Sequence, residues 1–255
     1  MERGEVSATL RAYPGTKRLR VMNQFTNIMF DLDGTLVDPG EGISRTIQFV
    51  LDRLAPEYRF EASFGWYVGP PLREIFTRLL PPDSSAELIE NAVSLYLQRF
   101  ESHGAKESIV YPEVAEMLAS LYSSRRLFVV TSKDTPIAEQ ILTTHRLRRY
   151  FETLIGTEGD DRFRNKGDAV RFLLEGSKLE SGATAIVGDR EHDLIAGRRN
   201  GIFTVGVSYG YGSRRELTEA GAHRICDSPR ELSELLVGDR TSLIAAGRSP
   251  TPKSP

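Results

Sequence analysis

Two aspartates, Asp31 and Asp33, stand at the end of an apolar run that begins at Ile28. An apolar run of this length is typical of a buried strand, and residues two apart lie on the same face of a strand, so we expect both carboxylates to project together. Two unpaired carboxylates in such a place repel each other and are costly to bury. A bound cation, or different protonation states of the two groups, would remove that cost. An ordinary Asp-Gly turn would account for Asp33 alone and would leave Asp31 unexplained.

The elements that must position these carboxylates alternate between strands and helices. Besides the strand predicted for the apolar run that begins at Ile28, strands are predicted at 127–132, 153–156, 184–189 and 202–207. Helical patterns lie between and around them, at 114–121, 137–144, 169–175 and 194–200. Such alternation is typical of an α/β fold, in which a parallel sheet has helices on both faces. In open sheets of this kind, ligands bind outside the carboxyl ends of the strands.

Polar side chains stand at several of these predicted strand ends. They are Asp31, Asp33, Thr131, Ser132, Asp189 and, one turn further on, Asp193, while Lys166 at the start of a helix could reach the same crevice. Carboxylates and hydroxyls beside one ammonium group are suited to a hard cation together with an oxyanion. Oxygen ligands favour magnesium over zinc, and no cluster of His or Cys is present in the sequence. Taken one at a time, each residue could equally end a strand, begin a helix or face solvent.

A helical segment interrupts the alternation. Apolar stripes at 43–54, 72–80 and 88–100 predict three helices, and residues 64–71 form a Gly- and Pro-rich turn between the first two. We therefore expect four parts. They are a flexible N-terminal extension over 1–25, a core made of 26–38 and 108–237, a helical insertion over 39–107 and a disordered tail over 238–255.

Composition excludes several classes of protein. The 255 residues are 40% hydrophobic and 27% charged, as in an ordinary globular protein that buries a core. A formal net charge of -2 gives no electrostatic reason to expect nucleic acid or an anionic membrane as a partner. The single cysteine, Cys226, excludes an internal disulfide. We therefore expect the protein to be cytoplasmic, because the cytoplasm is a reducing compartment. No apolar stretch approaches the roughly 20 residues that span a bilayer.

The polar groups occur in the order of four motifs of a known family. The sequence resembles the haloacid dehalogenase superfamily over about residues 27 to 237, at 31–36 (DLDGTL), 131–132 (TS), Lys166 and 188–193 (GDREHD). The helical insertion resembles the mobile cap of that superfamily. Residues 67–74 (YVGPPLRE) and 207–217 (VSYGYGSRREL) are similar to a branch named for phosphoglycolate phosphatase and 5'-nucleotidase.

The resemblance implies a Rossmann-like parallel sheet core with an inserted all-helical cap domain. It also implies a magnesium-dependent phosphatase that hydrolyses a small phosphate monoester through an aspartyl-phosphate. Asp31 would be the nucleophile, and Asp33 would protonate the leaving alkoxide and then activate water. An Asp at the second position disfavours a dehalogenase, because alkyl-halide chemistry needs no acid for the leaving group.

The remaining motif residues would hold the ion and the phosphoryl group. The resemblance implies that magnesium is bound by Asp31, the backbone carbonyl of Asp33 and Asp189, with Asp193 supporting the ion directly or through water. It also implies that Thr131, Ser132 and Lys166 bind the phosphoryl oxygens. The partner would be a small phosphorylated metabolite, with phosphoglycolate the first candidate and a nucleoside monophosphate the second. The chain would be a monomer or a homodimer. A phosphosugar mutase with the same intermediate, or a sensor of a phosphorylated ligand, are the alternatives.

Overall fold

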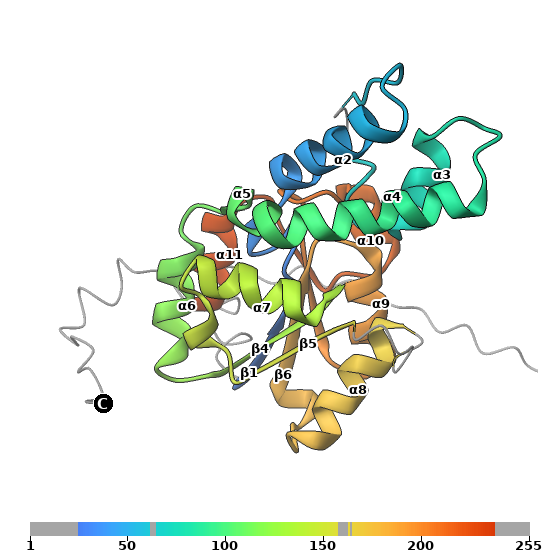
Figure 1. Cartoon of the computed structure of the whole chain (residues 1–255). Coiled ribbons are helices and arrows are strands. Elements are labelled where there is room, and N and C mark those ends of the chain that lie inside the picture. The colour runs from blue at the N-terminus through green and yellow to red at the C-terminus, as the bar shows by residue number, and fades with distance from the viewer. Residues whose placement is uncertain (1–24, 62–64, 158–162, 164, 238–255) are drawn as a thin grey trace, which may run out of the picture.

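The computed structural model describes residues 25–61, 65–157, 163 and 165–237 (Figure 1). The tail expected over 238–255, and all of the expected N-terminal extension except Phe25, lie outside the described residues.

A six-stranded parallel sheet forms the centre of the protein, in the order β5-β4-β1-β6-β7-β8. The strands are β1 (Asn27–Phe30), β4 (Arg126–Asp134), β5 (Thr153–Thr157), β6 (Thr184–Gly188), β7 (Phe203–Val207) and β8 (Arg224–Cys226). β1 lies in the middle, and its last residue, Phe30, is paired with Val129 on one side and Val187 on the other. All four residues of β1 are buried, as expected for a strand covered on both faces. The parallel sheet predicted from the sequence is therefore confirmed.

Helices cover both faces of the sheet (Figure 1). On one face lie α6 (Val114–Tyr122), α7 (Thr135–Thr144) and α11 (Pro229–Val237). On the other lie α8 (Lys166–Gly176) and α9 (Glu191–Arg199), with α10 (Arg214–Glu219) packed against α9, β7 and β8. Because successive side chains of a strand point to opposite faces, Ile28 and Phe30 join the first apolar cluster and Met29 joins the second.

A second group of helices is inserted between β2 and β3, and these helices lie together beyond one end of the sheet (Figure 1). They are α2 (Gly40–Leu54), α3 (Leu72–Leu79), α4 (Ala86–Arg99), the π-helix Phe100–Gly104 and α5 (Ala105–Glu107). The first begins after a proline. The N-cap of α4 is Ser85, whose hydroxyl accepts a hydrogen bond from the Leu88 backbone nitrogen at 3.2 Å. The protein therefore has a Rossmann-like core with an inserted all-helical cap, and we propose that the cap covers 39–107.

The two connections between core and cap form a small sheet that the sequence pattern did not predict. β2 (Val37–Asp38) pairs antiparallel with β3 (Ile109–Val110), so the chain leaves the core and returns to it along adjacent strands. Two-residue strands carry too little alternation to be recognised from sequence. Within the described part of the chain, no helix is both long and apolar enough to cross a membrane.

Truncation of one buried side chain in the central strand should test how much this core contributes to stability. Ile28 is fully buried in β1, and its replacement in Ile28→Ala leaves a cavity between sheet and helices. We expect a loss of about 2–5 kcal/mol in the free energy of unfolding, measured by urea denaturation. Ile109→Ala is the control, since Ile109 is 58% exposed and its truncation should cost less than about 1 kcal/mol. Equal losses in the two variants would contradict the packing described here.

Candidate active site

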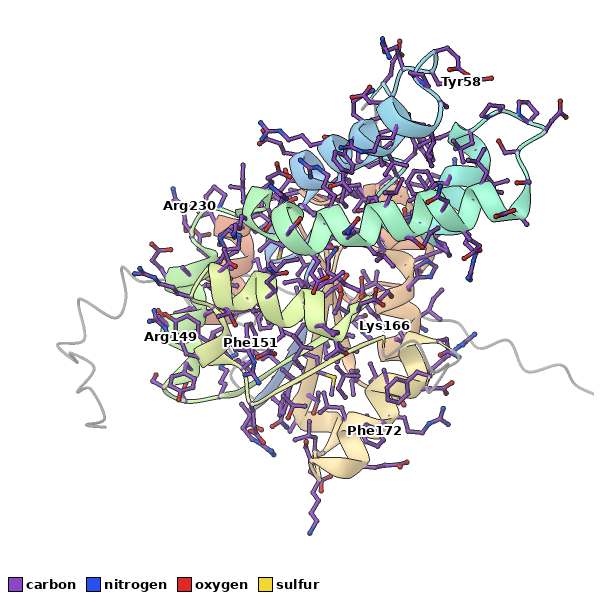
Figure 2. All side chains as sticks on the ribbon, in the orientation of Figure 1. Tyr58, Arg149, Phe151, Lys166, Phe172 and Arg230 are labelled. Carbon is purple, nitrogen blue, oxygen red and sulfur yellow. The ribbon has the colours of Figure 1, made fainter. Side chains whose placement is uncertain are left out.

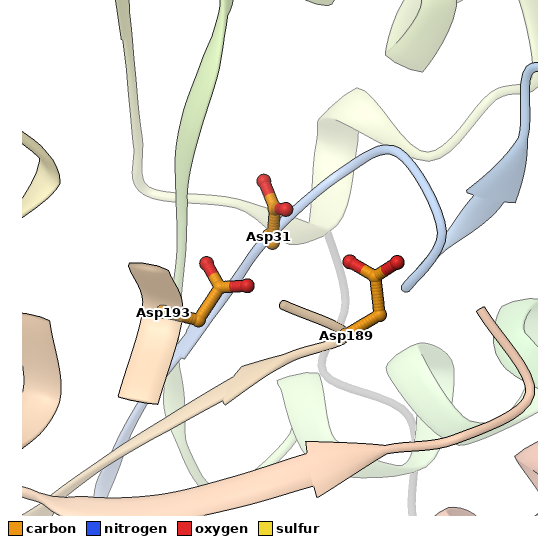
Figure 3. A group of neighbouring side chains, drawn as sticks. All are labelled: Asp31, Asp189 and Asp193. Atoms are coloured by element: carbon orange, nitrogen blue, oxygen red, sulfur yellow. The ribbon is translucent and has the colours of Figure 1, made fainter. Parts of the chain in front are cut away.

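Three carboxylates meet at the carboxyl ends of β1 and β6 (Figure 3). Asp31 follows β1, Asp189 follows β6, and Asp193 lies in the first turn of α9. One carboxylate oxygen from each lies within 4.8 Å of those of the other two, and all three side chains are buried. Figure 3 shows them projecting from three separate segments toward a common space. The sequence-predicted convergence of these aspartates is therefore observed in the geometry.

Backbone contacts hold the three aspartates in place. The Asp31 nitrogen donates to the Val187 carbonyl at 2.9 Å, which extends the pairing of β1 with β6 by one residue. The Arg190 nitrogen donates to Asp193 Oδ2 at 3.1 Å, and the Tyr211 nitrogen donates to Asp189 Oδ2 at 2.8 Å. Backbone nitrogens thus orient the carboxylates of Asp189 and Asp193, and the backbone of Asp31 is fixed to β6.

Gly34 allows the loop after β1 to approach Asp189. Its φ of +76° lies in the left-handed region, which side-chain-bearing residues rarely adopt. A Cβ at this position would lie 2.1 Å from Asp189 Oδ2, which is inside van der Waals contact. A glycine is therefore needed here both for the turn and for the close approach of the two loops.

Lys166 lies among these carboxylates, as predicted. It is the first residue of α8, and its Nζ lies 2.5 Å from Asp193 Oδ1 and 3.0 Å from Asp31 Oδ1. Burial disfavours the charged ammonium, but the carboxylates of Asp193 and Asp31 outweigh that effect and raise the pKa of Lys166. In Figure 2 the labelled Lys166 lies at the end of α8 nearer the cap, far from Phe172 further along the helix. Lys166 is therefore a fixed positive charge beside Asp31.

Asp33 points to a different partner from the other aspartates. Its Oδ2 lies 2.7 Å from Nζ of Lys133, and its Oδ1 is buried without a hydrogen-bond partner in the described residues. Burial raises the pKa of Asp33, and the Lys133 ammonium opposes that rise. The side chains of Asp31 and Asp33 therefore experience different environments, although they are only two residues apart.

Thr131 and Ser132 lie at the neighbouring strand end, in β4. Thr131 is buried and its Oγ1 accepts a hydrogen bond from the Lys133 nitrogen at 3.2 Å, while Ser132 is exposed. Because Phe30 is paired with Val129, these hydroxyl residues follow the same edge of the sheet as Asp31. The register thus brings the two hydroxyl residues to the end of the sheet where the carboxylates lie.

Two further residues at the site were not predicted from the sequence. β4 continues to Asp134 rather than ending at 132, so Lys133 is part of the strand. The signal was present, because Lys133 is two residues after Thr131 and residues two apart tend to share a face of a strand. Tyr211 lies in a loop that carries no periodic pattern. It contacts Asp189 through its backbone nitrogen, so the type of its side chain gave no indication of this contact.

A buried carboxylate oxygen without a hydrogen-bond partner fits a bound cation. Asp189 Oδ1 accepts no hydrogen bond in the described part of the chain, and the close partner of Asp31 Oδ1 is the Lys166 ammonium at 3.0 Å. Burial, and next the charges of Asp31 and Asp193, raise the pKa of Asp189 well above its ordinary value, and burial raises that of Asp193 to about 6 despite Lys166. A hard divalent cation would lower the cost of keeping these groups ionised, and an all-oxygen ligand set is the one that Mg²⁺ prefers.

The cap covers this end of the sheet. Arg190, the residue after Asp189, donates from Nη1 to the carbonyl of Val68 in the cap at 3.2 Å and from Nε to Glu216 at 2.8 Å. The Tyr211 ring lies so close to Gly65 that a Cβ on that glycine would be 2.4 Å from the ring. The cap and the loops that carry the acidic groups are thus in direct contact.

Fold and site together define a class of hydrolase, and comparison with known proteins gives its family. Residues 28–207 match the family model described as haloacid dehalogenase-like hydrolase. The chain is therefore a member of the haloacid dehalogenase-like hydrolase family, as its sequence motifs indicated.

Several proteins and crystal structures are similar to this chain over most of its length. It is 35% identical over 214 residues to a 5'-nucleotidase of Pseudomonas aeruginosa, across 84% of this chain and 96% of that protein. It is 28% identical over 226 residues to a phosphoglycolate phosphatase of Vibrio cholerae, across 85% and 99%. A crystal structure of a putative phosphatase from Clostridium difficile has a TM-score of 0.76 at 32% identity, across 83% and 98%. The similarity spans both the core and the inserted helices.

Proposed function

We propose that this protein is a magnesium-dependent phosphatase that hydrolyses a small phosphate monoester through an aspartyl-phosphate on Asp31. The observation that carries the proposal is the position of the Asp31 carboxylate. It lies with Asp189 and Asp193 in one buried cluster and 3.0 Å from the Lys166 ammonium. Asp33 stands apart, and its buried Oδ1 has no hydrogen-bond partner among the described residues. A carboxylate nucleophile beside cationic groups, with a second carboxylate in another environment, supports phosphoryl transfer in two steps.

In this mechanism Asp31 attacks phosphorus and expels the alkoxide. The Lys166 ammonium and the hydroxyls of Thr131 and Ser132 bind the phosphoryl oxygens and stabilise the charge that develops on them. Asp33 donates a proton through Oδ1 to the leaving oxygen and then accepts one from the water that hydrolyses the aspartyl-phosphate. The cap excludes bulk water while the ester is bound.

Magnesium would be held by the carboxylates of Asp31, Asp189 and Asp193 and by the backbone carbonyl of Asp33. The ion would offset the repulsion between an anionic nucleophile and an anionic phosphate. The cluster that supports this assignment consists of oxygen ligands alone.

Two substrates are candidates. Phosphoglycolate is the first, supported by the phosphoglycolate phosphatase relative. A nucleoside 5'-monophosphate is the second, and the relative named 5'-nucleotidase, which has the higher identity of the two, favours it. A phosphosugar mutase would use the same aspartyl-phosphate but return the phosphoryl group to a sugar, so that release of inorganic phosphate counts against it.

The test is phosphate release from phosphoglycolate, nucleoside monophosphates, sugar phosphates and p-nitrophenyl phosphate, with magnesium and with EDTA. We expect turnover only with the divalent ion, and the ranking by kcat/KM identifies the substrate class. Folded protein that binds magnesium but releases phosphate from none of these esters would overturn the proposal.

Magnesium binding has a readout that does not depend on activity. Because the ion binds the folded acidic cluster and not the unfolded chain, it should stabilise the protein by about 3 kcal/mol at a hundred times Kd, seen as a rise in Tm. Asp189→Asn should lose most of that rise, since it removes one buried carboxylate. Asp227→Asn is the matched control, because Asp227 is exposed on the surface and its change should leave the rise intact. An unchanged rise in Asp189→Asn would contradict the assignment.

A further inference from the structure

Lys133 lies on the side of the site where the leaving group of the proposed reaction must be. In phosphoryl transfer the attacking and leaving oxygens lie roughly in line with phosphorus. With Asp31 attacking and Asp33 protonating the leaving oxygen, the leaving group is next to Asp33 and away from Asp31. Lys133 Nζ is 2.7 Å from Asp33 Oδ2, so the two side chains face the same part of the substrate. This step rests on the proposed function.

The Lys133 ammonium has donor capacity to spare. An ammonium group carries three N–H donors, and one of them is used by Asp33. Nζ also lies 4.6 Å from the centroid of the Phe100 ring, a contact that needs no hydrogen bond. In the part of the chain that the structure describes, no second acceptor contacts this ammonium, although its side chain is only 12% exposed. A nearly buried cation with unused donors is arranged to receive an anion.

The backbone of Lys133 is fixed on both sides. Its nitrogen donates to Thr131 Oγ1 at 3.2 Å. Its carbonyl lies so close to β5 that a Cβ on Gly156 would be 2.4 Å away. The side chain therefore leaves a rigid part of the sheet, and its ammonium is held where a bound substrate would meet it rather than moving with a surface loop.

Two aromatic residues of the cap cover the same space. Tyr96 and Phe100 stack with ring centroids 5.5 Å apart, and both are buried. Burial, and next the nearby charge of Asp33, raise the pKa of the Tyr96 hydroxyl, which therefore remains a donor. No described residue forms a hydrogen bond with that hydroxyl. The leaving group would thus lie between the Lys133 ammonium of the core and the aromatic rings of the cap, where the Tyr96 hydroxyl is a hydrogen-bond donor.

We propose that Lys133 determines substrate specificity by binding an anionic group, above all a carboxylate, that stands close to the ester oxygen of the leaving group. The substrate class is then a phosphate ester of a small 2-hydroxy acid, in which a single carbon separates the ester oxygen from the carboxylate. A nucleoside offers uncharged ribose hydroxyls near its ester oxygen and would leave the spare donors of a nearly buried ammonium without an anionic partner.

A matched pair of substrates tests this inference. 2-Phosphoglycolate and 2-hydroxyethyl phosphate have the same ester group. Phosphoglycolate has a carboxylate at the position where 2-hydroxyethyl phosphate has an uncharged hydroxymethyl group. We expect the wild type to prefer phosphoglycolate in kcat/KM. Lys133→Met should lower that preference by roughly 10- to 100-fold, the range for one charged hydrogen bond, because it removes the charge and keeps the aliphatic stem against Phe100. Lys133→Arg should retain most of the preference.

Controls separate this inference from the proposed function. Lys178→Met alters an exposed lysine and should leave both kcat/KM values unchanged. If Lys133→Met does not fold by circular dichroism, Lys133→Gln replaces it in the same comparison. A loss that is equal for both substrates, or a wild type without preference for the carboxylate, would overturn the inference while the phosphatase stands. A wild type that hydrolyses neither ester and not p-nitrophenyl phosphate would overturn the proposed function itself.

Discussion

Replacing Asp31 with asparagine is expected to lower kcat for phosphate release by at least about four orders of magnitude, because it removes the nucleophile itself. An amide does not attack phosphorus at a useful rate, and no neighbouring carboxylate can substitute. Asp189 and Asp193 face the common space from other segments, and Asp33 is paired with Lys133 at 2.7 Å. The measurement is kcat for inorganic phosphate release at saturating magnesium, for each ester of the panel.

The matched control for this variant is Asp52→Asn. Asp52 is an exposed carboxylate on α2 that accepts a hydrogen bond from Gln48, and its replacement should leave kcat within a factor of about two. The fold of Asp31→Asn should survive, because the change relieves repulsion in the acidic cluster and leaves Lys166 paired with Asp193. A folded Asp31→Asn protein with near wild-type turnover would exclude the aspartyl-phosphate mechanism.

The sheet could be predicted from sequence because its strands are buried on both faces. β1 and β6 are continuous apolar runs followed by polar residues, and that contrast marks both the strand and its end. The shorter elements carry no such contrast. β2 and β8 have two and three residues, and α10 has six, which is too few for a periodic pattern to emerge.

The sequence predicted the site residues that act through their side chains. It did not predict contacts that depend on a backbone group or on an irregular strand register. Asp189 stands out after an apolar strand, but the nitrogen that orients it belongs to Tyr211, and any residue type supplies a backbone nitrogen. Lys133 was missed for another reason. The pairing of β4 with β5 shifts register between Val130 and Asp134, so the strand continues through polar residues that look like its end. Lys133 lies within that irregular stretch, and its ammonium contacts Asp33.

The contact between cap and core could not be predicted from the sequence, for a similar reason. Arg190 joins Val68 of the cap to the loop that carries Asp189, over a separation of 122 residues. Its partners are a backbone carbonyl and the Glu216 carboxylate, neither of which has a distinctive spacing from it. Motif order predicts which residues meet at the strand ends, whereas long-range polar contacts follow from the packed geometry.

Asp33→Asn should separate the two halves of the proposed reaction. For esters of ordinary alcohols, we expect kcat/KM to fall by about 10²- to 10⁴-fold, because the alkoxide then departs without a proton. For p-nitrophenyl phosphate the fall should be much smaller, since nitrophenolate is a stable anion that needs no acid. The asparagine amide oxygen can still accept from Lys133, so that ion-dipole contact and the local fold should persist.

The same variant should also accumulate the covalent intermediate. Without Asp33 to activate water, the aspartyl-phosphate formed from p-nitrophenyl phosphate is hydrolysed slowly, and an acid quench followed by intact-mass measurement should reveal a phosphorylated protein. Adding Asp31→Asn to Asp33→Asn must abolish that adduct, because the acceptor is then absent. If Asp33→Asn slows both kinds of ester equally and no adduct appears, Asp33 is not the proton donor. Its pairing with Lys133 would then serve only to hold the loop after β1 against β4.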